Sequence, residues 1–397
     1  MLQLSKKSCV LQKNKYTQNN TYNIRNVHMK EKKLSPFEEK MNNWIRDHLT
    51  PIKIMDRIFF LDHIRTMLHA GLSLIEALHV LAKEMENKRF RAIIGDIKTQ
   101  VEKGNQLSDV LSKYPKIFPS MYVKMISAGE TAGKLEESLE QIVNQMKKNH
   151  ELTSTIKGAM IYPAVILSAI GVVAILMVTV VLPKITSMFD EFDTELPLAT
   201  RVLIAITDFM SKPLNLIIVA ILIIGIISLF VYSLRLSPRF KYMVHSFNLH
   251  LPIFGSVIQH INLARFSLTL SSLLKSTLPI IEATDISSET VSNVCYTKAL
   301  KEAREKLEKG ISLSEILMSH GKLFPPMVTE MIMVGERTGE IDRLLEELSN
   351  FYAKEVDNTM KNFSTIIEPV IIIALGLAVA GIAVAVIMPM FSLMQNF

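Results

Sequence analysis

A stretch of sequence occurs twice in this 397-residue chain, and the duplication limits the folds that the chain can adopt. Phe118-Pro119 and a Gly-Glu-x-x-Gly motif at residues 129–133 recur as Phe324-Pro325 and the same motif at residues 335–339. The separation is 324 − 118 = 206 residues, and it persists without a gap. Further pairs at this separation are Leu68 and Leu274, Leu72 and Leu278, Glu76 and Glu282, Gly104 and Gly310, Leu107-Ser108 and Leu313-Ser314, Pro163 and Pro369, and Pro183 and Pro389. The chain therefore contains two copies of one unit, and both copies need the same fold.

Three windows without a charged residue predict membrane helices. They are residues 164–182, 214–232 and 370–388, and each is close to the roughly 20 residues that cross a hydrocarbon core of ~30 Å. Buried helices of a soluble core are the alternative, but such helices rarely lack polar residues on every face. The first and third windows match at the 206-residue separation, whereas the second has no counterpart in the first unit. We expect the second span to return the chain to the side on which it started.

The first unit reads as six helices joined by short links. Ser73-x-x-Glu76 predicts a capping box at the start of the second helix, and Gly104 is expected to end the third. The sixth helix has no stop signal before Pro163, so we expect it to continue into the first span, which Pro183 closes. Short helices with short links are typical of an antiparallel bundle.

The predicted fold is an all-α membrane protein with two duplicated cytosolic six-helix bundles and three transmembrane helices. The predicted parts are a basic tail (1–52), the first bundle (53–158), transmembrane helix 1 (159–183), an extracytoplasmic loop (184–213), transmembrane helix 2 (214–233), a cytosolic connector (234–258), the second bundle (259–363), transmembrane helix 3 (364–391) and an extracytoplasmic C-terminus (392–397). The second unit has Thr277 in place of Gly71 and Pro279 in place of Ser73. We expect its helix ends to differ there.

Basic residues flank the three spans on one side. They are Lys147, Lys148 and Lys157 before the first, Arg235, Arg239 and Lys241 after the second, and Lys354 and Lys361 before the third. The positive-inside rule then places the N-terminus and both units in the cytosol and the C-terminus outside. The net charge of +6 is interpreted as flank charge, and no nucleic-acid partner is expected. The basic tail is interpreted as solvated and disordered, with weak contact to anionic lipid headgroups as the alternative.

The Gly-Glu-x-x-Gly motif is interpreted as a structural hairpin between two helices. We expect Gly129 to adopt a positive φ as the helix stop, and Gly133 to allow close approach at the start of the next helix. The second unit repeats this pattern at Gly335 and Gly339. A phosphate-binding loop is the alternative, but the motif lacks a preceding strand and a following Lys-Ser/Thr. A hairpin does not require an acid, so the acids of the two motifs, Glu130 and Glu336, are candidates for contact with a partner.

The sequence contains no constellation of catalytic or metal-ligating residues. The histidines do not have the three- or four-residue spacing that places two ligands on one helix face. The two cysteines, Cys9 and Cys295, build neither a disulfide framework nor a zinc site. We therefore expect no enzymatic activity, no cofactor and no metal.

Two helical units, each with Phe-Pro, Gly-Glu-x-x-Gly and then Tyr162-Pro163 or Glu368-Pro369 at the start of a span, resemble the type II secretion system F family. The resemblance covers roughly residues 55 to 394. It implies a non-enzymatic platform in the inner membrane of a type IV pilus or type II secretion machine. It also implies partners: a cytosolic assembly ATPase, a pilin or pseudopilin, other inner-membrane assembly proteins, membrane lipid and further copies of the chain. A multi-pass transporter or a membrane-anchored signalling protein is the alternative, although transporters usually have more spans and inverted repeats.

Glu368 is a candidate functional acid in the membrane. It stands directly before Pro369, where the first unit has Tyr162, and it is expected at or just inside the cytosolic face of the membrane. An acid at that depth is costly and is by default a functional candidate. The equal alternative is a carboxylate that reaches headgroup water. If functional, Glu368 is expected to pair with a base such as Lys157 or to accept a hydrogen bond from an incoming pilin helix.

Overall fold

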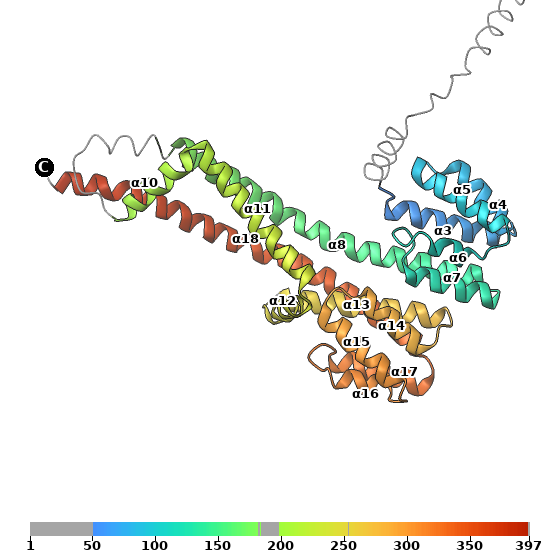
Figure 1. The fold of residues 1–397 in the computed structure, drawn as a ribbon. Coiled ribbons are helices and arrows are strands. Elements are labelled where there is room, and N and C mark those ends of the chain that lie inside the picture. Colours follow the sequence, from blue (N-terminus) through green and yellow to red (C-terminus); the bar gives the residue numbers. More distant parts are fainter. Residues whose placement is uncertain (1–50, 182, 184–197, 253, 396–397) are drawn as a thin grey trace, which may run out of the picture.

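The computed structural model describes residues 51–181, 183, 198–252 and 254–395, and in these ranges the chain forms helices and no strand. Two bundles of shorter helices lie at one end of the molecule, and the long helices extend from them in one direction (Figure 1). The all-α, duplicated architecture predicted from the sequence is confirmed.

The first bundle contains the six predicted helices. They are α3 (Ile54–His69), α4 (Leu74–Glu84), α5 (Lys88–Glu102), α6 (Leu107–Ser112), α7 (Ser120–Ala132) and α8 (Leu135–Leu176). Pro163 lies inside α8, so the sixth helix does run from the bundle into the first apolar window without a break.

The second bundle repeats this order of elements. Its helices are α13 (Phe254–Lys275), α14 (Ile280–Thr290), α15 (Val294–Leu307), α16 (Leu313–Met318), α17 (Pro326–Thr338) and α18 (Ile341–Gln395). The 206-residue separation is kept in three dimensions, since α6 begins at Leu107 and α16 at Leu313. The first helix, α13, begins earlier than the predicted boundary at residue 259.

The middle of the chain is more helical than predicted. It contains the π-helix η1 (Met177–Val181), α10 (Leu198–Ser211), α11 (Pro213–Leu236) and α12 (Pro238–His250). The interpretation of residues 184–213 as a loop is wrong for α10, a helix that lies against η1, α11 and α18. The rest of that predicted loop lies outside the described residues. The predicted connector 234–258 holds α12, a helix that packs against the second bundle.

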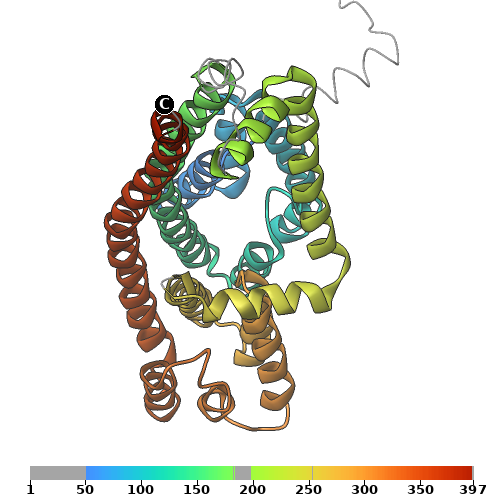
Figure 2. The same ribbon diagram turned by 90° about the vertical axis from the view of Figure 1, so that its left-hand side faces the viewer.

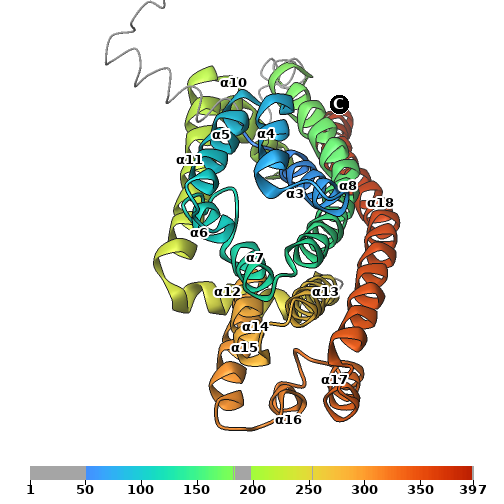
Figure 3. The same ribbon diagram turned by 90° about the vertical axis from the view of Figure 1, so that its right-hand side faces the viewer.

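Among the residues that the structure describes, three helices are long and apolar enough to cross a membrane. Their apolar stretches fall within Leu135–Val181, Ile217–Leu236 and Ile341–Gly381, which agrees with the three windows predicted from the sequence. Large apolar side chains along these stretches are exposed, as expected for surfaces that face lipid rather than water. Helices α8 and α18 lie side by side, and α11 lies on the opposite side of the molecule (Figures 2 and 3).

Each bundle is built on an equivalent trio of buried aromatic rings. Phe60 packs against Phe90 and Phe118 with ring centroids 5.4 and 5.9 Å apart. The second unit places Phe266, Tyr296 and Phe324 at the same separation of 206, with centroids of Phe324 5.5 and 5.3 Å from the other two. All six rings are fully buried. Offset and edge-to-face aromatic pairs of this kind anchor a core beyond their buried area.

The two units differ at the turn after their first helix, as the sequence predicted. In the first unit Gly71 has φ +86° and Ser73 forms the predicted capping box with Glu76. In the second unit Thr277 adopts φ +62°, and Pro279 caps α14 without a side-chain hydrogen bond. A β-branched residue in the left-handed region is strained. The second unit therefore keeps this turn at a cost in folding free energy.

Thr277→Gly is expected to raise the thermal stability of the protein. Glycine adopts the left-handed conformation without strain, so we expect a gain of about 1 kcal/mol. This corresponds to roughly 4–8 °C in the melting temperature of a bundle of this size. The matched control is Gly71→Thr, which places threonine in the equivalent turn of the first unit. This variant is expected to lower the melting temperature. Equal melting temperatures for Thr277→Gly and the wild type would contradict the strain at this turn.

Candidate functional site: two hairpins and the contact between the units

The two Gly-Glu-x-x-Gly motifs form equivalent hairpins, but the two glycines of each motif exchange the roles predicted for them. Gly133 ends α7 with φ +68°, and Gly339 ends α17 with φ +77°. Gly129 and Gly335 instead lie inside these helices. The prediction that Gly129 is the helix stop with positive φ is therefore wrong. The helix continues for one more turn because Gly133 supplies the left-handed residue.

Gly129 and Gly335 are the positions of close approach. A Cβ atom on Gly129 would lie 2.3 Å from Ser138 Oγ and 2.6 Å from Ser138 Cβ, on the next helix. A Cβ atom on Gly335 would lie 2.7 Å from the Cα atom of Ile341. Each hairpin therefore closes on a glycine that has no room for a side chain, and no phosphate-binding function is needed to explain the motif.

The acid of each motif caps a neighbouring short helix. The carboxylate of Glu130 accepts hydrogen bonds from the backbone N–H of Leu107 (2.6 Å) and of Ser108 (2.9 Å), the first residues of α6. Glu336 accepts from the N–H of Leu313 (2.7 Å) and of Ser314 (3.3 Å) at the start of α16. A carboxylate at a helix N-terminus accepts hydrogen bonds from N–H groups that have no partner within the helix. Its negative charge also interacts favourably with the positive end of the helix dipole.

Sequence reasoning missed this role of the two acids, although the signal was present. Leu107-Ser108 and Leu313-Ser314 recur together with the motifs, 22 to 23 residues before the glutamates. The recurrence alone does not show which of the repeated residues touch. The hairpin itself does not require an acid, but the N-termini of α6 and α16 each use one as a cap. Glu130 and Glu336 therefore accept hydrogen bonds from within the chain.

Glu130→Ala is expected to destabilise the first bundle by about 1–3 kcal/mol, because two partly buried N–H groups lose their acceptor. Glu130→Gln keeps one acceptor oxygen and should fall between alanine and wild type. Glu137→Ala is the control, since Glu137 is an exposed acid at the start of α8. Thermal melting of the purified protein distinguishes the variants. A Glu130→Ala protein that melts with the control would show that this cap contributes nothing.

Buried polar side chains join the two units. Gln145 of α8 donates to Thr269 Oγ1 (3.1 Å) and accepts from Ser272 Oγ (2.8 Å), both on α13. All three side chains are almost fully buried. Since each buried polar atom in the group has a partner, this network fixes how the units sit on each other.

A charged cluster extends this contact toward solvent. Glu346 of α18 accepts from Lys148 of the first unit at 2.8 Å and also binds Lys275. The hydrogen bond from Lys148, followed by that from Lys275, lowers the pKa of Glu346 to about 2. Lys148 also donates to Asn350 at 3.1 Å. At neutral pH this cluster therefore holds a carboxylate between two ammonium groups from the two units.

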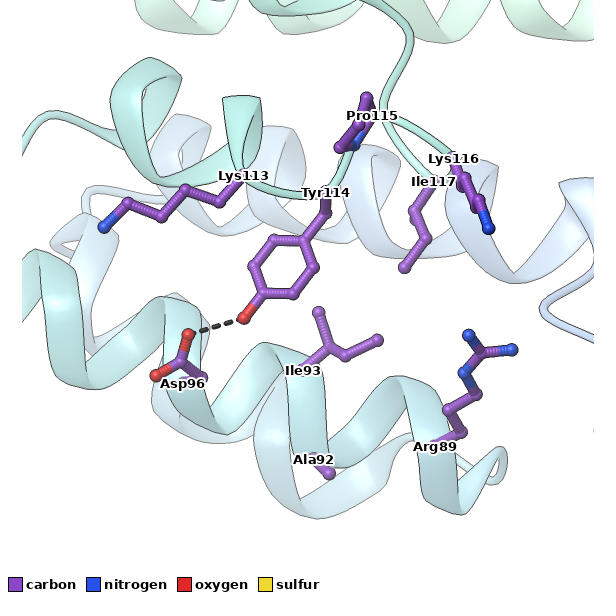
Figure 4. A pocket seen from close by; sticks show the side chains of 9 residues that line it. All are labelled: Arg89, Ala92, Ile93, Asp96, Lys113, Tyr114, Pro115, Lys116 and Ile117. Carbon is purple, nitrogen blue, oxygen red and sulfur yellow. Dashed lines mark hydrogen bonds between the residues drawn. The ribbon is translucent and has the colours of Figure 1, made fainter. Parts of the chain in front are cut away.

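Each unit also carries a surface hollow at the same place. In the first unit a cavity of about 490 Å³ lies between α5 and the link from α6 to α7 (Figure 4). Its polar centre is Tyr114, whose hydroxyl donates to Asp96 at 2.5 Å. Burial and the Asp96 carboxylate raise the pKa of Tyr114 to about 12, so it remains a donor at neutral pH. In the second unit the corresponding pair is His320 and Glu302, in a cavity of about 680 Å³.

The prolines that recur at the 206-residue separation lie in or next to the long helices. Pro163 and Pro369 are inside α8 and α18, and Pro183 follows η1. Pro389 lies inside α18, which continues to Gln395, so it does not end its helix.

Glu368 is exposed on α18 and forms no ion pair with any residue that the structure describes. The structure does not bring it into a salt bridge with Lys157, which is also exposed on α8. The carboxylate therefore faces outward from the helix.

Within the described ranges, no group of three or more His, Cys, Asp or Glu side chains is placed to hold a metal ion. The arrangement consists of two equivalent hairpins, a hydrogen-bonded contact between the units, and long apolar helices that continue from both bundles.

Comparison with known proteins agrees with this architecture. The chain matches the family described as "Type II secretion system (T2SS), protein F" twice, over residues 60–183 and 266–389, again 266 − 60 = 206 residues apart. It is 36% identical over 345 residues to the type IV pilus assembly protein PilC of Thermus thermophilus, covering 86% of this chain and 83% of the relative. It is 33% identical to PilC of Myxococcus xanthus, with 93% and 88% covered. It is 32% identical to type II secretion system protein F of Aeromonas hydrophila, with 83% and 84% covered. The chain belongs to the type II secretion system protein F family.

Proposed function

We propose that the chain is the inner-membrane platform of a type IV pilus or type II secretion machine. In this role it couples a cytosolic assembly ATPase to the polymerisation of pilin or pseudopilin, without catalytic chemistry of its own. The observation that carries the proposal is the pair of duplicated bundles, which are fixed to each other and to apolar helices running in one direction. Such a body transmits a movement applied to the bundles into the membrane. The relatives named for pilus assembly and for secretion support the same role.

The proposed topology places both bundles in the cytosol, where an ATPase is available, and the C-terminus outside. Lysine and arginine flank the spans on the side of the bundles, which supports this orientation. Single cysteines in a chain without Cys9 and Cys295 test it in intact cells. Position 190 is expected to react with an impermeant maleimide, whereas positions 103 and 309 are expected to react only after lysis. Labelling of position 309 from outside would overturn the topology.

We expect the assembly ATPase to bind to the two helical bundles. A pull-down with the purified chain as bait should retain the assembly ATPase of the same organism. A transporter or a signalling protein, the two alternatives, has no reason to retain it. If the ATPase fails to bind while the chain still supports assembly, the coupling role fails and a purely membrane-embedded role remains.

The contact between the units also supports a homo-oligomer. The two units use different faces in this contact, so residues that are buried there in one unit have exposed counterparts in the other. Gln145 is buried in the contact, but its counterpart on α18, Phe351, is 42% exposed. Leu278 is buried in the turn that faces α7, but its counterpart Leu72 is 37% exposed. A head-to-tail contact leaves the equivalent faces free to bind another copy. We propose that Phe351 of one copy packs against the first unit of the next.

Phe351→Ser is therefore expected to shift the purified chain toward smaller assemblies. An interface residue that acts as a binding hot spot weakens binding by about 2 kcal/mol or more when its side chain is truncated. Multi-angle light scattering in detergent measures the mass of the protein part. Phe254→Ser, at an exposed aromatic residue on α13, is the control. An unchanged mass for Phe351→Ser over a dilution series would exclude this face as the contact between copies.

A further inference from the structure

The chain bends sharply where the second apolar helix ends. Helix α11 ends at Leu236 and α12 begins at Pro238, so one residue, Ser237, separates them. Ser237 caps α12 by accepting a hydrogen bond from the N–H of Phe240 (3.3 Å), and proline is favoured at the first helical position. Helix α12 runs across the direction of the long helices (Figures 1 and 2). Because α11 is long and apolar enough to cross a membrane, this bend places α12 along the membrane surface.

Contacts on two sides hold α12 in this direction. Phe230 of α11 and Phe240 of α12 meet edge to face, with ring centroids 5.9 Å apart. At the second unit, the N–H of Val294 donates to Nδ1 of His245 (3.2 Å), and the side-chain amide of Asn293 donates to the His245 carbonyl (3.1 Å). The bend between α11 and α12 is therefore a fixed part of the structure.

A cavity of about 600 Å³ lies where α11, α12 and the start of α15 meet, and we call it the elbow cavity. Val231 and Leu234 line it from the last turns of α11, at the end of the apolar stretch. Arg235 of α11 and Lys241 of α12 also line it, and its lining residues include no acid. The elbow cavity thus combines an apolar wall with two bases at the end of a span.

The positive charge of the elbow cavity comes from Arg235 and Lys241 and not from His245, which also lines it. Burial, followed by the nearby Lys241 ammonium group, lowers the pKa of His245, so its imidazole is neutral at pH 7. A neutral imidazole that accepts the Val294 N–H through Nδ1 carries its own hydrogen on Nε2. The cavity therefore offers two cations and hydrogen-bond donors.

The bases at the bend differ from other bases beside the spans in having no acidic partner. Three bases of α8 and α18 form ion pairs, and these pairs are Lys147 with Asp62, Lys148 with Glu346, and Lys361 with Asp357. Arg235, Arg239 and Lys241 are all exposed, and none of them pairs with an acid in the ranges that the structure describes. Uncompensated bases next to a span attract the phosphates of anionic lipid headgroups.

Helix α12 and its junction with α11 also expose large apolar side chains. Leu236, Met243 and Phe247 are between 60% and 63% exposed. Met243 and Phe247 are four residues apart and so share one face of α12. Exposed apolar residues together with bases, on a helix that runs across the end of a span, are typical of a helix in the membrane interface.

We propose that α12 lies in the membrane interface and that the elbow cavity binds an anionic phospholipid. Arg235 and Lys241 hold the phosphate, because a guanidinium and an ammonium group are the side chains that bind phosphate oxygens most strongly. The acyl chains lie along Val231 and Leu234, so the ligand is a lipid rather than a soluble phosphate. The proposal rests on the membrane placement of α11 and not on coupling to an ATPase, so the lipid site and the coupling role can fail independently.

Native mass spectrometry of the full-length chain in neutral detergent tests the class of lipid. Phosphatidylglycerol and phosphatidylcholine with the same acyl chains are offered in equal amounts. We expect the wild type to retain phosphatidylglycerol preferentially. Arg235→Gln and Lys241→Gln should each weaken that preference roughly fivefold, and the double variant should abolish it.

The matched control for this experiment is the double variant Lys157→Gln, Lys354→Gln. It removes the same charge from exposed positions before the other two spans, and it should keep the preference for phosphatidylglycerol. Equal retention of the two lipids by the wild type would refute the site. Equal losses in the two double variants would show a general effect of charge beside the spans and would refute it as well.

A melting series separates a lipid from a soluble phosphate. A ligand that binds the folded chain raises its melting temperature. Phosphatidylglycerol is expected to do so for the wild type and not for the Arg235→Gln, Lys241→Gln variant. Glycerophosphoglycerol, which is the same headgroup without acyl chains, should have no effect even in large excess. An equal rise with the soluble headgroup would assign the cavity to a soluble phosphate compound, and no rise with either would exclude phosphate binding.

Fluorescence quenching in vesicles tests the position of α12. In a Cys9→Ser, Cys295→Ala background, Met243→Cys and Lys301→Cys are labelled with the same fluorophore. Lys301 is an exposed residue of α15 and serves as the control position. Lipids with a nitroxide near the headgroup should quench the label at position 243 and leave the label at position 301 unaffected. Equal quenching at the two positions, or none at position 243, would contradict an interfacial α12.

Discussion

Gly129→Val is expected to abolish most of the folded protein in the membrane. The first atom of any side chain at this position would lie 2.6 Å from Ser138 Cβ, and rotation of the serine does not remove that contact. Helices α7 and α8 must move apart, and the buried residues beside them, Met125 and Leu139, lose their packing. Overpacking of this severity costs about 3–5 kcal/mol, a large part of the stability of a domain.

Three further variants identify the cause of the Gly129→Val effect. Gly95→Val, in α5, places the same side chain where a Cβ meets nothing within 4 Å, and it should accumulate normally. Gly129→Ala should already lose most of the stability, because the clash begins at Cβ. Adding Ser138→Gly to Gly129→Ala should restore part of it. Abundance in membranes and melting of the purified protein are the measurements. A Gly129→Val protein that melts like Gly95→Val would refute the close approach of α7 and α8.

Glu368→Leu is expected to block filament or pseudopilus assembly while the protein still inserts and accumulates. The carboxylate is exposed on α18 next to an apolar stretch and has no ion-pair partner among the described residues. An outward-facing acid at the margin of a span is available to an incoming pilin helix, where a buried hydrogen bond to a charged group has a large effect. Glu368→Gln keeps the hydrogen-bonding shape and should retain part of the activity.

The control for Glu368 is an acid of the same helix outside the span. Asp357→Leu removes a carboxylate that pairs with Lys361 one turn along α18, and it should assemble filaments normally. Filament counts and membrane abundance are measured together. Wild-type filament numbers for Glu368→Leu would show that Glu368 only reaches headgroup water. Loss of the protein from the membrane would show a structural role instead.

The sequence was sufficient to predict the duplication, the three apolar helices and the helical class, because these depend on period and composition. It also predicted the capping box at Ser73 and the altered turn at Thr277, because these depend on residues close in sequence. It did not predict α10 as a helix, because packing against α18 and η1 decides its conformation.

Contacts between distant residues were beyond sequence reasoning. The cap that Glu130 places on α6 joins residues 22 to 23 positions apart, and the contact of Gln145 with Thr269 joins residues 124 apart. For a related reason, the prediction assigned the helix stop to Gly129 and the close approach to Gly133, whereas the structure has the reverse. Both glycines are compatible with a helix stop, and the packing of α7 against Ser138 decides which one is used.

The most direct test of the platform role is removal of the chain from its own cells, with pilin and ATPase followed separately. We predict that pilin is still made and inserted in the membrane and that the ATPase is still present, while surface filaments, or secretion in a secretion machine, are lost. Expression of the chain from a plasmid should restore them. Filaments or secretion at wild-type levels without the chain would contradict the platform function.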